Sequence, residues 1–226
     1  MFRSMLRIAL PLAACLALPV AAQPGGAYPQ KPIRMIISAP PGTAPDIIAR
    51  LIGDKLDLDL GQRIIPDNRP TAQGIVAVDG IRQANPDGYT IGLLQAAAAV
   101  VTPYTYKGAT YDIERDLETV ATVAYTPMLF VSTPTAPGKT FADLIAIGKA
   151  KPEDIAIGNP IRSSIPHLAA ELLGQRTGAR YRHVSFTGTG QAIQALMAGD
   201  LPYYVDGTAP LLPFVRSGKL LSLIHI

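Results

Sequence analysis

The alternation of predicted strands and helices between residues 33 and 94 is the feature that most limits the fold. Residues 33–37, 62–65 and 89–94 form short runs typical of buried strands. Residues 47–56 and 75–84 have helical spacing, and residues 85–88 (Asn-Pro-Asp-Gly) predict a turn. Residues 67–70 (Asp-Asn-Arg-Pro) predict another turn. This order predicts a parallel sheet with helices on both faces, where ligands usually bind at the carboxyl ends of the strands.

The loop before the first predicted helix has the features of an anion site. Thr43 and Asp46 are three residues apart and predict a capping box at the helix start. The apolar face of this helix is predicted to contain Ile47, Ile48, Leu51, Ile52 and Leu56. A helix amino end after a strand offers unpaired N–H groups to a carboxylate or phosphate. The sequence has neither a GxGxxG nor a GxxxxGK[ST] motif here, so a plain connecting loop is an equally open interpretation.

A second set of elements begins at Val120. Strands are predicted at 120–124, 128–132, 155–157, 181–185 and 202–205, and helices at 141–150, 164–177 and 189–198. We expect an N-terminal α/β lobe over residues 23–122 and a second lobe over 123–220, joined near 120–126. The small side chains from Ala96 to Ala99 follow a predicted strand end and leave room beside it.

Residues 1–22 have the composition of an export signal. Arg3 and Arg7 precede an apolar stretch, and small residues follow at Val20–Ala22. An alternative is a lipoprotein cleavage box at Cys15, the only cysteine, but this shortens the apolar stretch. Without residues 1–22 the chain has 18 basic and 17 acidic residues, a net charge of +1. We therefore expect an exported globular protein without a nucleic-acid partner.

A series of short motifs occurs in the order found in one known family. The motifs lie at Tyr28–Arg34, Pro41–Asp46, Leu60–Gln62, Asp67–Pro70, Pro86–Thr90, Tyr111–Asp112, His167–Ala169, His183–Val184 and Ser217–Leu220. They resemble the substrate-binding proteins of tripartite tricarboxylate transporters, also called Bug receptors. The resemblance implies a type II periplasmic-binding-protein-like fold, in which two α/β lobes close on a small organic carboxylate. It also implies a periplasmic monomer that delivers the ligand to the membrane subunits of a tripartite transporter, with no enzyme activity and no cofactor.

The resemblance also implies which residues bind the ligand. Pro41, Gly42, Thr43 and Asp46 correspond to one half of a carboxylate pincer, in which backbone N–H groups and ordered waters hold the carboxylate. The second half is expected between Asn159 and His167. The other implied ligand-binding residues in the chain are Ser163, Ser164, Ala96, Thr187, Gly188, Thr189 and Asp206.

The sequence departs from the family pattern at positions that bear on the ligand. Thr43, Ala44, Ile161 and Ser163 stand where relatives usually have glycine, and each replacement narrows the available backbone conformations. Arg162 is either a solvated side chain or a guanidinium that binds a carboxylate. Relatives also continue beyond the Gly-Lys-Leu motif, so we expect residues 221–226 to be the atypical terminus of a truncated chain.

Two other functions remain to be weighed. Ser164 and His167 suggest a serine hydrolase, but there is no GxSxG motif, so enzyme activity is not expected. A ligand sensor for a membrane signalling partner stays open, because transport and sensing would use the same cleft. The three histidines and Cys15 lack metal-binding spacing, so no metal site is expected, and His183 is expected to be structural.

Overall fold

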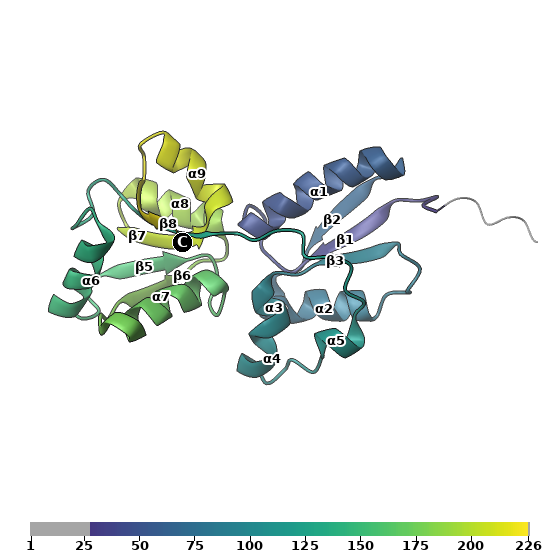
Figure 1. The fold of residues 1–226 in the computed structure, drawn as a ribbon, viewed down its shortest axis with the longest axis horizontal. Coiled ribbons are helices and arrows are strands. Elements are labelled where there is room, and N and C mark those ends of the chain that lie inside the picture. The colour runs from purple at the N-terminus through teal and green to yellow at the C-terminus, as the bar shows by residue number, and fades with distance from the viewer. Residues whose placement is uncertain (1–27, 226) are drawn as a thin grey trace, which may run out of the picture.

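The computed structural model describes residues 28–225, which form two α/β lobes (Figure 1). The predicted export signal lies outside the described residues. In the first lobe, β1 (Ile33–Ile37) lies between β2 (Ile64–Asn68) and β3 (Thr90–Leu93), and both pairings are parallel. The connecting helices are α1 (Ala44–Leu60) and α2 (Ile75–Arg82). The predicted strand and helix alternation is therefore confirmed.

The helices of the first lobe cover both faces of its sheet. Odd-numbered residues of β1, such as Met35, pack with Ala49 of α1, whereas Ile36 approaches α2. Leu51 was predicted on the apolar face of α1 but is 62% exposed. The buried side of α1 includes Gly53 instead, where an added Cβ would lie 3.5 Å from the Ile64 side chain. This is ordinary van der Waals distance, so β2 packs directly against this side of α1.

Short helices complete the first lobe below the sheet in Figure 1. They are α3 (Ala96–Val100), α4 (Thr102–Thr105) and α5 (Ile113–Asp116), and the 3₁₀ turn η1 (Thr71–Gly74) directly precedes α2. Two turn predictions have different outcomes. Asp67 and Asn68 belong to β2, so that turn starts later than predicted, because both residues pair with β1. The segment 85–88 bends between α2 and β3, as predicted.

The second lobe contains a mixed sheet in the order β6-β5-β7-β4-β8. Its strands are β4 (Met128–Ser132), β5 (Ala156–Asn159), β6 (Arg182–Ser185), β7 (Tyr203–Gly207) and β8 (Leu221–His225). β4 is antiparallel to both β7 and β8, and the other pairings are parallel. Residues 221–225, expected as an atypical terminus, thus form an edge strand of this sheet.

Helices cover both faces of the second sheet. The helices α6 (Phe141–Ala150) and α7 (Ile165–Thr177) lie on one face, and α8 (Thr189–Ala198) and α9 (Thr208–Arg216) lie on the other (Figure 1). Alternate residues of β7 separate two cores: Tyr203 packs on the α6 and α7 side, and Tyr204 on the α8 and α9 side. No helix among residues 28–225 is long and apolar enough to cross a membrane.

The lobes are joined by an extended segment, residues 117–127. The strand predicted at 120–124 is wrong, because this segment, with three β-branched residues, pairs with no strand in the described part of the chain. Val120 and Tyr125 are each 92% exposed. Strand propensity needs a neighbouring strand to become a sheet, and this segment crosses between the two sheets instead.

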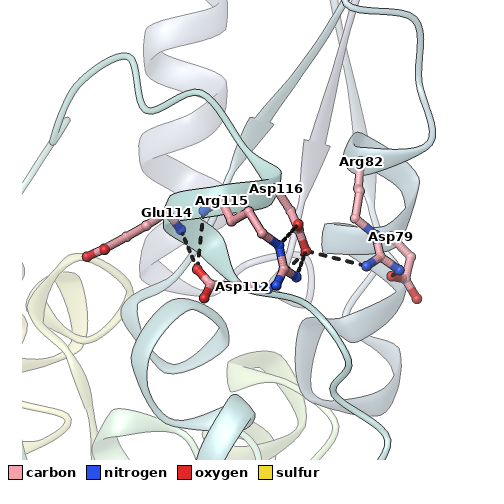
Figure 2. Close-up of polar contacts among 6 residues, drawn as sticks. All are labelled: Asp79, Arg82, Asp112, Glu114, Arg115 and Asp116. Carbon is pink, nitrogen blue, oxygen red and sulfur yellow. Dashed lines mark hydrogen bonds and ion pairs between the residues drawn. The ribbon is translucent and has the colours of Figure 1, made fainter.

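A polar network fixes the start of the crossing segment (Figure 2). The Asp112 carboxylate accepts hydrogen bonds from the first-turn N–H groups of α5. Asp116 pairs with Arg115 at 2.7 Å and with Arg82 of α2 at 3.5 Å, and Arg82 also pairs with Asp79 at 2.8 Å. Exposed pairs contribute little stability one by one, but together they tie the end of α5 to α2.

Candidate functional site

A cavity of about 320 Å³ lies between the two lobes. Four segments that contribute to it are the first loop (residues 38–43), the start of α3, the crossing segment and the second loop (residues 160–164). Its lining residues in the described chain are Pro40, Thr43, Ala44, Pro45, Ile48, Leu93, Leu94, Gln95, Ala96, Val123, Ala124, Tyr125, Thr126, Met128, Pro160, Ile161, Ser164, Ile165, Pro166, Asp206 and Gly207. The prediction that the two loops face one cleft is confirmed.

The first loop is held by side-chain hydrogen bonds at the start of α1. The predicted capping box between Thr43 and Asp46 is wrong. The Thr43 hydroxyl donates to the Pro40 carbonyl at 2.7 Å, and the Asp46 carboxylate accepts from the Gly42 N–H at 2.8 Å. Gly42 has φ +77°, which turns its N–H back toward the helix. The loop is therefore fixed before any ligand binds.

Asp46 connects the first loop to the rest of the lobe. Its residue is 2% exposed, and its carboxylate accepts from the Asn68 amide at 2.8 Å and from Arg50 Nε at 3.1 Å. Burial alone would raise the pKa of Asp46, but the hydrogen bonds from Arg50, Gly42 and Asn68 hold it below its usual value. Asp46 does not line the cavity, so its contribution is to position the loop.

The second loop starts α7 in a similar position on the other lobe. Ser164 is the N-cap: its hydroxyl donates to the Ile161 carbonyl at 2.6 Å and accepts from the His167 N–H at 3.4 Å. The start of α1 and the start of α7 therefore lie on the same cavity. Both helix dipoles favour an anion there.

Asp206 is the second-last residue of β7 and lines the cavity from the second lobe. It is 3% exposed and accepts hydrogen bonds from Thr189 Oγ1 at 2.5 Å, Tyr204 OH at 3.0 Å and its neighbouring Gly207 N–H at 2.7 Å. Burial raises the pKa of Asp206 to about 6, although these three donors favour the ionised form. The carboxyl group is thus poised to change charge near neutral pH.

The structure separates the predicted ligand-binding residues into two groups. Thr43, Ala96, Ser164 and Asp206 line the cavity. The remaining predicted residues outside its lining are Pro41, Gly42, Asp46, Asn159, Ser163, His167, Thr187, Gly188 and Thr189.

Several residues of the second group still lie close to the site. An added Cβ at Gly188 would lie 3.4 Å from Pro40 Cβ, so the two lobes come close to each other there. Thr187 is exposed and its hydroxyl donates to the Gln191 side chain at 2.8 Å.

Asn159 is buried at the end of β5, and its amide nitrogen has no hydrogen-bond partner among the described residues. Arg162, for which two roles were open, is exposed and outside the lining.

Much of the lining was not predicted from the sequence. Tyr125 and Thr126 come from the crossing segment, and the Gln95 amide donates to the Ser38 carbonyl at 3.1 Å. The added residues are mainly apolar, and none of the described lining residues is a lysine or arginine. The break between the two sets of elements was the only sequence signal for the crossing segment, and it did not show which side chains face the cavity.

Three titratable side chains meet elsewhere in the second lobe. His167, at the end of the expected second half-site, packs its ring against His183 with centroids 5.3 Å apart. Glu171 Oε1 lies 3.6 Å from His167 Nε2 and 3.4 Å from His183 Nε2. The sequence spacing did not predict this cluster, because it does not show that β6 lies beside α7. Burial, opposed by Glu171, lowers the pKa of His167.

The contact at Gly207 provides a test of the cavity. An added Cβ at Gly207 would lie 2.7 Å from Ala44 Cβ in the other lobe and 2.7 Å from Thr126 Cγ2. Gly207→Ala is expected to force the lobes apart and lower the melting temperature, since overpacking costs about 1–3 kcal/mol. Gly190→Ala is the control, because an added Cβ there meets nothing within 4 Å. Equal melting temperatures for both variants and the parent would show that the lobes do not touch at Gly207.

The sequence comparisons identify related proteins. The model of the family described as "Tripartite tricarboxylate transporter family receptor" matches residues 48–225. A UPF0065 protein of Bordetella bronchiseptica is 33% identical over 91% of this chain and 61% of its own length. The protein BugT of Bordetella pertussis is 32% identical over 92% of this chain and 63% of its own length. The chain thus spans less than two thirds of the length of these curated relatives.

Solved structures share the same two-lobe fold. A periplasmic transporter structure is 30% identical and superposes with a TM-score of 0.82 over 88% of this chain and 67% of that one. An R. palustris protein solved with adipate is 25% identical, with a TM-score of 0.83 over 88% of this chain and 66% of that one. The predicted type II periplasmic-binding-protein-like fold is confirmed.

Proposed function

Because the chain belongs to the tripartite tricarboxylate transporter receptor family, we propose that it is a periplasmic receptor for a small organic carboxylate. The observation that carries this proposal is the position of two helix starts, α1 and α7, on one cavity between the lobes. Each helix start offers first-turn N–H groups that the helix itself cannot satisfy. A carboxylate accepts hydrogen bonds from such groups without a cationic side chain.

The apolar lining supports a ligand with a hydrocarbon body. Leu94, Ile161 and Met128 lie around the same cavity as the two helix starts. Contact with them would replace water around the carbon chain, while the polar loop atoms fix the carboxylate. Adipate, present in the structure of the R. palustris relative, has this chemistry.

We propose Thr43, Ala96, Ser164 and Asp206 as direct ligand contacts. Pro41, Gly42, Thr187, Gly188 and Thr189 would form or support the rim of the site. Delivery of the ligand to the membrane subunits of a tripartite transporter follows from the family and belongs to the same proposal. A sensor that signals to a membrane partner is the second candidate, since lobe closure would serve either role.

Catalysis is not part of the proposal. In a serine hydrolase the imidazole would take the proton of the nucleophile. Here the Ser164 hydroxyl contacts the backbone N–H of His167, and the imidazole Nδ1 accepts from the Ser163 N–H at 3.3 Å. The serine hydroxyl is used for helix capping.

A thermal-shift panel tests the proposed ligand class. Adipate, shorter dicarboxylates and aromatic acids are compared with adipamide, which keeps the carbon chain of adipate but has no charge. A carboxylate at 100 times its Kd is expected to stabilise the protein by about 2.7 kcal/mol, and adipamide is expected to have no effect. Stabilisation by adipamide or a neutral sugar, with none from any carboxylate, would contradict the proposal.

A further inference from the structure

The histidine cluster of the second lobe has the chemistry of a metal site. His167 and Glu171 lie one turn apart on α7, and His183 lies on the neighbouring edge strand β6. Each residue offers a ligand atom, and these atoms all lie within 4.8 Å of one another. The two histidine side chains are 13% and 17% exposed, and that of Glu171 is 52% exposed. None of the three lines the cavity between the lobes.

The two separations between Glu171 and the histidines fit a shared ion better than direct hydrogen bonds, and the three ligand atoms all lie within 4.8 Å of one another. Glu171 Oε1 lies 3.6 Å from His167 Nε2 and 3.4 Å from His183 Nε2. These separations exceed the usual range of about 2.7–3.2 Å for N–H···O hydrogen bonds. Ligand atoms at about 2.1 Å from a tetrahedral zinc ion are about 3.4 Å apart. We propose that His167, Glu171 and His183 bind one Zn²⁺ ion through His167 Nε2, His183 Nε2 and Glu171 Oε1.

The ring orientations determine which nitrogen atoms can bind the ion. His183 Nδ1 is buried and has no hydrogen-bond partner among the described residues, so Nε2 is the atom of this ring that interacts. His167 Nδ1 accepts from the Ser163 N–H at 3.3 Å. Binding through Nε2 places the proton on Nδ1 and removes this contact. Zinc binding therefore removes one long hydrogen bond of the second loop and leaves the Ser163 N–H without this acceptor, a cost that zinc coordination has to exceed.

The surroundings leave space for a fourth ligand. Glu171 and His183 line a surface cavity of about 550 Å³, which Tyr181, Glu153 and Arg180 also border. Glu153 and Arg180 form an ion pair there. Water can complete the tetrahedron from this cavity, as at sites with three protein ligands. Two imidazoles and one carboxylate favour zinc over magnesium, which prefers oxygen ligands.

Metal titration of the full chain tests the proposal. After chelator treatment and its removal, calorimetry with zinc chloride is expected to give one zinc per chain with a micromolar or lower Kd. Zinc is also expected to raise the melting temperature, because it links α7 to β6. Magnesium chloride is expected to give neither effect.

Substitutions locate the ion. His183→Gln and Glu171→Gln are each expected to weaken zinc binding at least tenfold, whereas His225→Gln on β8, at the opposite edge of the sheet, is expected to leave it unchanged. Glu171→Gln changes a half-exposed side chain, so it keeps the test valid even if His183→Gln fails to fold. Unchanged zinc affinity in Glu171→Gln, or no saturable binding by the parent chain, would overturn the proposal. The result is independent of the carboxylate test, because the measured ligand is zinc.

Discussion

Asp46→Ala is expected to weaken carboxylate binding by about 10- to 100-fold and to lower the free energy of unfolding by about 2–4 kcal/mol. The substitution removes the acceptor for the Gly42 N–H and the Asn68 amide, and it removes the partner of Arg50. Buried donors then lack partners, and the first loop loses the contact that fixes it. Binding would have to order the loop again, at a cost of about 1–2 kcal/mol per residue.

Calorimetric titration with adipate and urea unfolding measure the two effects. Asp59→Ala is the matched control, because Asp59 is an exposed acid on the same helix. Asp46→Asn is expected to have an affinity and a stability between those of the parent and Asp46→Ala. The amide keeps one acceptor oxygen, but its NH₂ group faces other N–H donors and cannot accept from them. If Asp46→Ala lowers stability and leaves affinity unchanged, Asp46 supports the lobe but does not position the loop.

Carboxylate affinity is expected to rise about 25-fold when the pH is lowered from 7.5 to 5.5. Burial raises the pKa of Asp206 to about 6, so this side chain is mainly neutral at the lower pH. A neutral Asp206 does not repel a carboxylate in the same cavity, whereas an ionised one does. An aromatic monocarboxylate is the probe for this measurement, because its own pKa is near 4 and it remains ionised at pH 5.5. The apparent affinity therefore follows the fraction of protein with protonated Asp206.

The same group links stability to pH in the ligand-free protein. The pKa of Asp206 is raised from 3.8 to about 6 on folding, so the folded state binds the proton more tightly. Its contribution to stability is complete below pH 3.8 and is lost as the pH rises to about 6, a change of about 3 kcal/mol. Asp206→Asn is expected to remove most of the pH dependence of the binding of an aromatic monocarboxylate. The same dependence in Asp206→Asn would assign it to another group.

The sequence by itself determined the order of most elements and the location of both loops. Apolar runs and helical spacing are patterns among residues close together in the chain, so they can be read from the sequence. The bounds of β1, β4, α6 and α8 were predicted in this way within one or two residues. The family motifs placed the two loops before α1 and α7, and both loops reach the cavity. Their roles as ligand contacts remain predictions, which the binding experiments above address.

Only the tertiary structure decided which side chains face each other. Residues 120–124 have strand propensity but no neighbouring strand in the described chain, and Asp46 takes the Gly42 N–H because the backbone turns there. His183 reaches Glu171 because β6 lies beside α7, a contact between residues 12 positions apart. Local propensity acts between close neighbours in the chain, whereas these contacts depend on how separate elements pack. For this reason the sequence predicted the loops, while packing determined the cavity lining and the histidine cluster.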